Sequence, residues 1–238
     1  MKLFFGPLIA SVALSAVSFA APLVFNETFS TSSTAIASTS TNGVYVAAPA
    51  QTTPTSAYTR TVFAKKTGNA GLGLMQAYVD TGEFTISAGS SVFGIAGAVY
   101  DLGTAADLTG SPAGFSIDWV FSDNPGGTLT FFITSNATPT DLTGIANIVN
   151  GASGVAWKSF TTLTSAPQSF STTISAILAA NNNGVDIANI TGFGFFWDTP
   201  MAQDSTFDNF AVTGVPEPGT YALMGAGLAA LALLRRRK

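Results

Sequence analysis

Apolar and polar residues alternate most clearly in two segments near the middle of the chain. Residues 115–121, FSIDWVF, and residues 128–134, TLTFFIT, each place apolar side chains at every second position. Residues 122–127 between them, SDNPGG, are typical of a turn. We therefore predict an antiparallel hairpin with one buried face.

Similar short segments occur along most of the chain and are separated by Gly, Asn or Pro. The further strands that this pattern predicts are 22–29, 43–48, 58–64, 72–79, 83–87, 92–100, 155–163, 168–173, 190–197 and 205–213. Helical spacing of apolar residues predicts two short helices at 141–149 and 174–180. No repeat of fixed period is present. The expected fold is all-β, a single jelly-roll-like β-sandwich.

Composition excludes several kinds of chemistry. The chain has no His and no Cys. It therefore lacks Ser-His-Asp and Cys-His nucleophile systems, His/Cys zinc sites and disulfides. Residues 21–214 contain four Lys or Arg against twelve Asp or Glu, a net charge of −8. Phosphate backbones are bound by clustered cations, so this balance argues against a nucleic-acid partner.

The N-terminus has the features of a secretory signal peptide. Lys2 precedes an apolar stretch at 3–17, and Ser18-Phe19-Ala20 has the small-x-small form of a cleavage site. Signal peptidase is expected to remove residues 1–20. An uncleaved N-terminus that stays in the membrane is the alternative.

The C-terminus combines an apolar run with a basic end. Residues 219–234 are sixteen uncharged residues, and as a helix they span about 24 Å, somewhat less than a hydrocarbon core of about 30 Å. We expect them to form a transmembrane helix. The cations that follow resist translocation and are expected to stay in the cytoplasm: Arg235, Arg236, Arg237 and Lys238. Residues 21–214 would then lie outside the inner membrane, as one exported domain.

Between that domain and the apolar run lies Val215-Pro216-Glu217-Pro218, whose prolines favour an extended backbone. Together with 219–234 and the basic tail 235–238, this segment resembles the PEP-CTERM sorting signal of Gram-negative bacteria. The resemblance covers residues 215–238 and implies processing by an exosortase near the motif, followed by release from, or attachment to, the cell surface. It also implies a link with exopolysaccharide and biofilm production.

Three residues are candidates for binding a sugar. Trp119 and Trp197 share the apolar parity of their strands, which predicts that they lie in the core. Phe196 has the opposite parity, which it shares with Asp198, while Trp157 lies beside Lys158. Aromatic faces can stack on sugar rings, so Trp157, Phe196 and Asp198 form the expected ligand site, with simple packing as the alternative.

Two acids have the parity of buried residues. Glu27 has the same parity as Phe25 and Phe29, and Asp208 has the parity of Phe210. Buried carboxylates need a partner, and oxygen ligands suit Ca²⁺. The surrounding NETF and FDNFAV are similar to the terminal strands of carbohydrate-binding-module jelly rolls, and this resemblance implies a structural Ca²⁺ between the two ends. The alternatives are pairing with Arg60 or a bulge at Asp208 that turns the acid outward.

These features predict a non-catalytic protein of the cell surface or extracellular matrix that adheres to or binds glycans. One alternative is a glycan hydrolase that uses paired carboxylates. Another is a purely structural or ice-binding surface protein.

Overall fold

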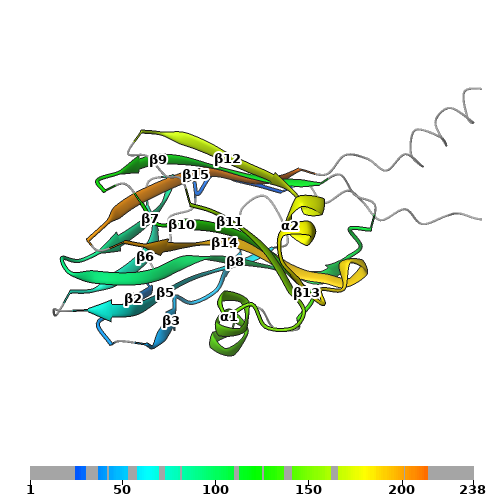
Figure 1. Cartoon of the computed structure of the whole chain (residues 1–238), viewed down its shortest axis with the longest axis horizontal. Helices are drawn as coiled ribbons and strands as arrows, with labels where there is room; N and C mark the ends of the chain where they lie inside the picture. Colours follow the sequence, from blue (N-terminus) through cyan, green and yellow to red (C-terminus); the bar gives the residue numbers. More distant parts are fainter. Residues whose placement is uncertain are drawn as a thin grey trace, which may run out of the picture.

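Two antiparallel β-sheets pack face to face (Figure 1). The computed structural model describes residues 25–30, 37–41, 43–52, 58–69, 73–80, 82–109, 113–124, 126–136, 141–161, 166–200 and 202–213. The expected signal peptide and the expected sorting segment lie outside these residues. The all-β sandwich is confirmed.

The first sheet, sheet A, has the strand order β12-β9-β15-β7-β6-β2, and β1 also pairs with β15. Its strands are β1 (Phe25–Glu27), β2 (Ala37–Thr39), β6 (Met75–Asp80), β7 (Glu83–Ala88), β9 (Gly114–Ser122), β12 (Gln168–Thr173) and β15 (Asp204–Thr213).

The second sheet, sheet B, has the order β13-β11-β10-β14-β8-β5-β3, and β4 also pairs with β5. Its strands are β3 (Tyr45–Ala47), β4 (Gln51–Thr52), β5 (Thr59–Asn69), β8 (Val92–Ala106), β10 (Thr128–Thr134), β11 (Val155–Phe160), β13 (Asn182–Asn183) and β14 (Ile190–Thr199). The helical elements are α1 (Leu142–Val149), α2 (Ile174–Ala180) and the 3₁₀ turn η1 (Ile187–Asn189).

Every strand and helix predicted from periodicity is present, most of them with shifted ends. The three strands that the sequence did not predict are β2, β4 and β13, which have two or three residues each. Such short segments show no alternation long enough to be recognised. Their pairing partners, β6, β5 and β11, determine that they are extended.

The predicted hairpin between 115–121 and 128–134 is wrong. The two segments are strands, but β9 pairs with β12 and β15 in sheet A, whereas β10 pairs with β11 and β14 in sheet B. The intervening turn residues therefore cross between the sheets. The apolar faces of β9 and β10 meet across the core, where the rings of Phe115 and Phe131 are 5.9 Å apart.

Aromatic rings dominate the interior between the sheets. Trp119 and Trp197 are buried and contact each other edge to face at 4.8 Å, which confirms the prediction that both are core residues. The Trp197 indole donates to Gln203 Oε1 at 2.9 Å, so its polar atom is satisfied inside the core.

Sheet B also has a second apolar layer on its outer face. Helix α1 begins at the N-cap Asp141, whose side chain accepts from Gly144 N, and packs Ile145 and Ile148 against the sheet. This layer explains why the strand β10 is buried on both faces.

Candidate functional site

The three predicted ligand residues lie on one face of the molecule. On β14, Phe196 pairs with Thr130 and Asp198 pairs with Thr128 of β10. Trp157 of β11 pairs with Phe132, the next outward residue of β10. Because alternate residues of a strand point to opposite faces, all three side chains lie on the outer face of sheet B.

Phe196 is nevertheless a packing residue. It is 8% exposed and lies in the apolar layer beneath α1, with its ring 6.1 Å from that of Phe132. The expectation of an accessible aromatic at this position is therefore wrong. Sequence parity gave the face correctly, but it could not show that a helix covers part of that face.

Trp157 is half-buried at the border of this layer. Its ring lies against Gly151 in the turn after α1, where an added Cβ would come within 2.6 Å of the indole. Gly151 has a φ of 62°, so glycine serves both the turn and the close approach of the ring. The indole is thus held in a fixed orientation while part of it faces solvent.

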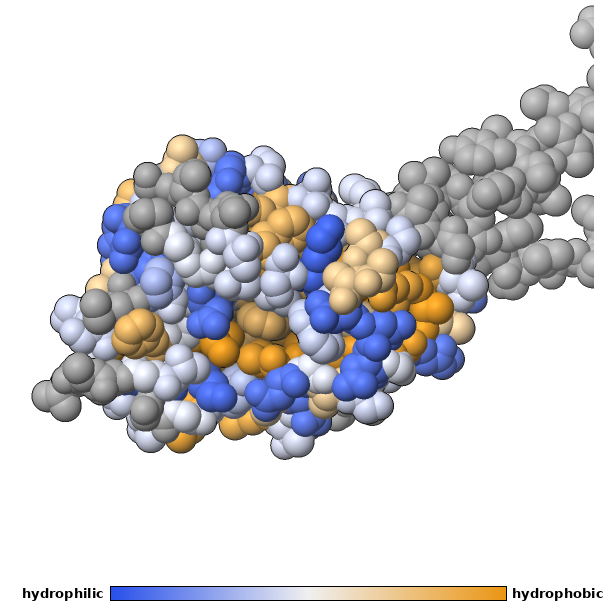
Figure 2. Space-filling view, viewed as in Figure 1, coloured by the Kyte–Doolittle hydropathy of each residue, from blue (hydrophilic) through white to orange (hydrophobic). Residues whose placement is uncertain are grey.

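A row of residues crosses sheet B beside the layer. Strand pairing joins Tyr45, Lys65, Ile95, Asp198 and Thr128 in register from β3 to β10. We call these five residues the Tyr45–Asp198 row. Its members are half-buried or exposed. Figure 2, in which both sheets are seen in profile, shows apolar surface in the middle of the domain bordered by hydrophilic residues.

The Tyr45–Asp198 row has a cation beside an aromatic ring at one end and a carboxyl group near the other. Lys65 Nζ lies 4.4 Å from the centre of the Tyr45 ring, a cation–π contact. Burial raises the pKa of Tyr45 to about 12, so its phenol is neutral at physiological pH. Burial also raises the pKa of Asp198. Neither Tyr45 nor Lys65 was predicted from the sequence. Both are far from Asp198 along the chain, and only the strand pairing shows that they share a row with it.

Glu27 lies on β1 and is 2% exposed. Its Oε2 accepts from Arg60 Nη1 at 3.0 Å, and its Oε1 accepts from Phe29 N at 2.8 Å. Burial raises the pKa of Glu27, and the Arg60 guanidinium acts in the opposite direction. The inward parity predicted for Glu27 is confirmed, and its partner is Arg60.

Asp208 does not face the interior. The register of β15 against β9 shifts between Asp208 and Ala211, and Asn209 has a φ of 51°. This bulge buries both Phe207 and Phe210 and leaves Asp208 opposite Asp118 on the outer face of sheet A. The prediction that Asp208 points inward is wrong, and the alternative of a bulge is what the structure has.

Glu27 and Asp208 therefore cannot bind between them the Ca²⁺ ion that the sequence predicted. Glu27 is in register with the buried Phe210, so its carboxylate and that of Asp208 lie on opposite faces of sheet A. Within the described ranges, no three His, Cys, Asp or Glu residues are grouped so that they could hold a metal ion.

The predicted sorting segment begins directly after the domain. Its named residues are Val215 to Pro218 and Arg235 to Lys238. Strand β15 ends at Thr213, and the residues after it lie outside the described part of the chain. None of the helices that the structure describes has the length and apolar character needed to cross a membrane.

Residues 214–238 match a family model, the PEP-CTERM protein-sorting motif. The chain carries a sorting signal. This match confirms the resemblance of the C-terminal segment, from the Pro-Glu-Pro sequence to the basic tail.

Solved structures similar to the chain include carbohydrate-binding modules of Clostridium thermocellum. A family 11 module of a cellulosomal cellulase is 14% identical, with a TM-score of 0.41 over 84% of this chain and 98% of that chain. A family 30 module of another cellulosomal cellulase is 12% identical, with a TM-score of 0.43 over 81% and 99%. An exo-β-agarase is 11% identical, with a TM-score of 0.39 over 83% and 25%. No curated protein matches the chain.

Proposed function

We propose that the protein is exported across the inner membrane of a Gram-negative bacterium, processed by signal peptidase and an exosortase, and delivered to the cell surface or the extracellular matrix. The motif match at residues 214–238 carries this proposal. The order of parts supports it, because the last strand ends at Thr213, immediately before the motif, the apolar run and the basic tail. The domain would be a non-catalytic component of an exopolysaccharide matrix or biofilm.

Deleting Pro216-Glu217-Pro218 is expected to abolish processing. In a host that contains the matching exosortase, the natural chain should lose about its last twenty residues, whereas the deletion variant should stay in the inner membrane with Lys238 present. Intact-mass spectrometry of the membrane and surface fractions measures both outcomes.

The matched control replaces Arg235, Arg236 and Arg237 by Lys. Membrane topology depends on positive charge, which this variant keeps, so its processing should continue. Lys238 on the mature surface form of the natural chain would contradict the proposed sorting.

We further propose that the outer face of sheet B binds a polysaccharide of the matrix. The observation that supports this role is the Tyr45–Asp198 row with Trp157 on the same face. Ligand sites combine apolar and aromatic surface with a few polar groups that fix orientation. The row offers the Tyr45 ring, an ammonium, a carboxylate and a Thr hydroxyl, all held on strands rather than on loops.

Replacing Tyr45 or Trp157 by Ala should weaken glycan binding by roughly tenfold or more, as removal of an aromatic anchor does in other interfaces. The natural protein and both variants would be compared on an array of bacterial polysaccharides, with thermal melts to verify folding. Tyr78→Ala is the matched control, because Tyr78 is a half-buried residue of β6 on the outer face of sheet A. Equal binding by all four proteins would contradict the assignment, and release of reducing ends would favour the hydrolase alternative.

A further inference from the structure

Both ends of the described domain lie at one end of the sandwich. Phe25 of β1 pairs with Val212 of β15, one residue before the strand ends at Thr213. Figure 1 shows β1 and the end of β15 together at the end where α2 lies. We call this end, around Thr213, the tail end.

The tail end has few features that would attract a membrane surface. Of the four cations that the structure describes, Arg60 and Lys66 are buried, and Lys65 and Lys158 lie within strands of sheet B. Exposed carboxylates follow β8 and precede η1 near the tail end, at Asp107 and Asp186. Anionic headgroups attract cations and repel carboxylates, so this end is not built to adhere to lipid.

Large exposed apolar side chains gather toward the opposite end. Leu74 and Phe93 are each 43% exposed. Both lie near the start of β8, whose first residue Val92 pairs with Asn69 at the far end of β5. These two large exposed side chains therefore lie away from the tail.

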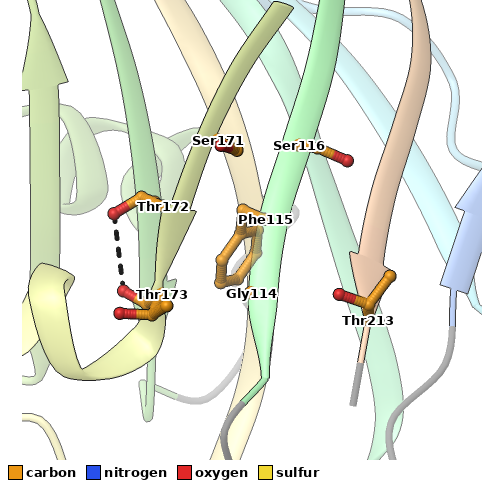
Figure 3. A pocket seen from close by; sticks show the side chains of 7 residues that line it. All are labelled: Gly114, Phe115, Ser116, Ser171, Thr172, Thr173 and Thr213. Atoms are coloured by element: carbon orange, nitrogen blue, oxygen red, sulfur yellow. Dashed lines mark hydrogen bonds between the residues drawn. The ribbon is translucent and has the colours of Figure 1, made fainter. Parts of the chain in front are cut away.

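A hollow of about 410 Å³ lies at the tail end, across β12, β9 and β15 of sheet A (Figure 3). Small uncharged residues border it: Gly114, Ser116, Ser171, Thr173 and Thr213. Strand register joins Ser171 to Ser116, and Gly114 to both Thr173 and Thr213. Gly114 has no side chain, so the floor between the two threonines is backbone.

Chain geometry places this hollow next to the sorting motif. Pro216 is three residues beyond Thr213, and an extended chain covers at most about 3.6 Å per residue, or about 11 Å in total. A folded domain of 100 residues already has a radius of gyration of about 13 Å. An enzyme that holds Pro216 to Pro218 in its active site is therefore brought against the tail end of the sandwich.

We propose that the tail end is a docking surface for the exosortase that processes the sorting motif, with the hydroxyl-bordered hollow as its centre. This inference rests on the proposed sorting function. Short hydroxyl side chains and bare backbone can form hydrogen bonds with a partner without ordering long side chains. The domain thereby contributes to recognition of its own tail.

The test follows cleavage of the full chain in cells that contain the exosortase, by pulse-chase and intact mass. Ser171→Arg and Thr173→Arg, which project a long side chain over the hollow, should each slow cleavage by roughly tenfold, the effect of about 1.4 kcal/mol. Ser38→Arg is the matched control, because Ser38 is an exposed serine on the outer face of the same sheet, on the edge strand β2. It should be cleaved at the natural rate. Ser171 and Ser38 are exposed, so both serine variants should melt like the natural chain. Thr173 Oγ1 accepts from Ala176 N as the N-cap of α2, so Thr173→Arg should lose about 1 kcal/mol of stability and remain folded in the same melts.

A flexible insertion of about ten residues after Thr213 tests whether slow cleavage is caused by contact between the enzyme and the domain. With the longer linker the enzyme no longer needs to touch the domain, and Ser171→Arg should have no effect on cleavage. Without the insertion, equal cleavage rates for Ser171→Arg, Thr173→Arg and the natural chain would overturn the inference. With the insertion, slow cleavage of Ser171→Arg would also overturn it. Failure of the sorting proposal looks different, because the natural chain itself would then remain uncleaved.

Discussion

Replacing Arg60 by Met is expected to lower the free energy of unfolding of residues 21–214 by about 3–5 kcal/mol, because it leaves the Glu27 carboxylate buried without its cation. Arg60 and Glu27 are each 2% exposed, and their charged atoms are 3.0 Å apart. The guanidinium also donates to Gln51 Oε1 at 3.1 Å and lies 5.9 Å from the centre of the Phe29 ring. Urea melts measure the loss.

The double variant Glu27→Gln with Arg60→Met is the control for this effect. It removes both charges while keeping an oxygen that can accept from Phe29 N, so part of the lost stability should return. A double-mutant cycle isolates the coupling of the pair. Stability of the double variant no greater than that of Arg60→Met would show that the unpaired charge is not the cause.

The pH dependence gives a second signature of the same pair. Burial raises the folded-state pKa of Glu27 above its ordinary value of 4.5, while Arg60 opposes this shift. A raised pKa means that protonation of Glu27 stabilises the fold below 4.5, and that this contribution is lost as the pH rises through the folded-state pKa. Without Arg60 the pKa rises further. The deficit of Arg60→Met should therefore shrink as the pH is lowered from about 7 to about 4.

Replacing Phe210 by Ala should cost about 3–5 kcal/mol, the range for removal of a buried aromatic side chain. The ring of Phe210 is fully buried and contacts six other rings, those of Phe25, Tyr100, Phe115, Phe131, Phe193 and Phe195. These rings come from both sheets, so a cavity here weakens the contact between the two layers. The melting temperature of the domain should fall by roughly 6–20 °C.

Phe93→Ala is the matched control, since Phe93 is 43% exposed and its loss opens no cavity. It should change stability by less than about 1 kcal/mol. Comparable losses for the two variants would mean that Phe210 is not the centre of the core.

Strand positions could be predicted because they depend on local alternation. Segments such as 128–134 and 168–173 match the structure at both ends. Strand pairing could not be predicted in the same way. The segments on either side of SDNPGG alternate as a hairpin does, yet they join different sheets, because each buries its apolar face against the other across the core.

The candidate site depended on both the local sequence pattern and the tertiary structure. Parity placed Phe196 and Asp198 on one face of their strand, and the register of β10 and β11 adds Trp157 to that face. Accessibility depended on α1, which adds Ile145 and Ile148 to the apolar layer that contains Phe196. Tyr45 and Lys65 joined the site only through the pairing of β3, β5, β8 and β14.

The sequence alone determined the sorting signal and the longer β-strands, because a short motif and a two-residue period are properties of neighbouring residues. Tertiary structure decided where Glu27 and Asp208 point. A one-residue bulge at Asn209 reverses the faces of the residues around it, and the sequence offered this bulge only as an alternative to an inward Asp208. The partner of Glu27 is Arg60, thirty-three residues away, because burial of the carboxylate requires a cation that only the folded chain brings within 3.0 Å.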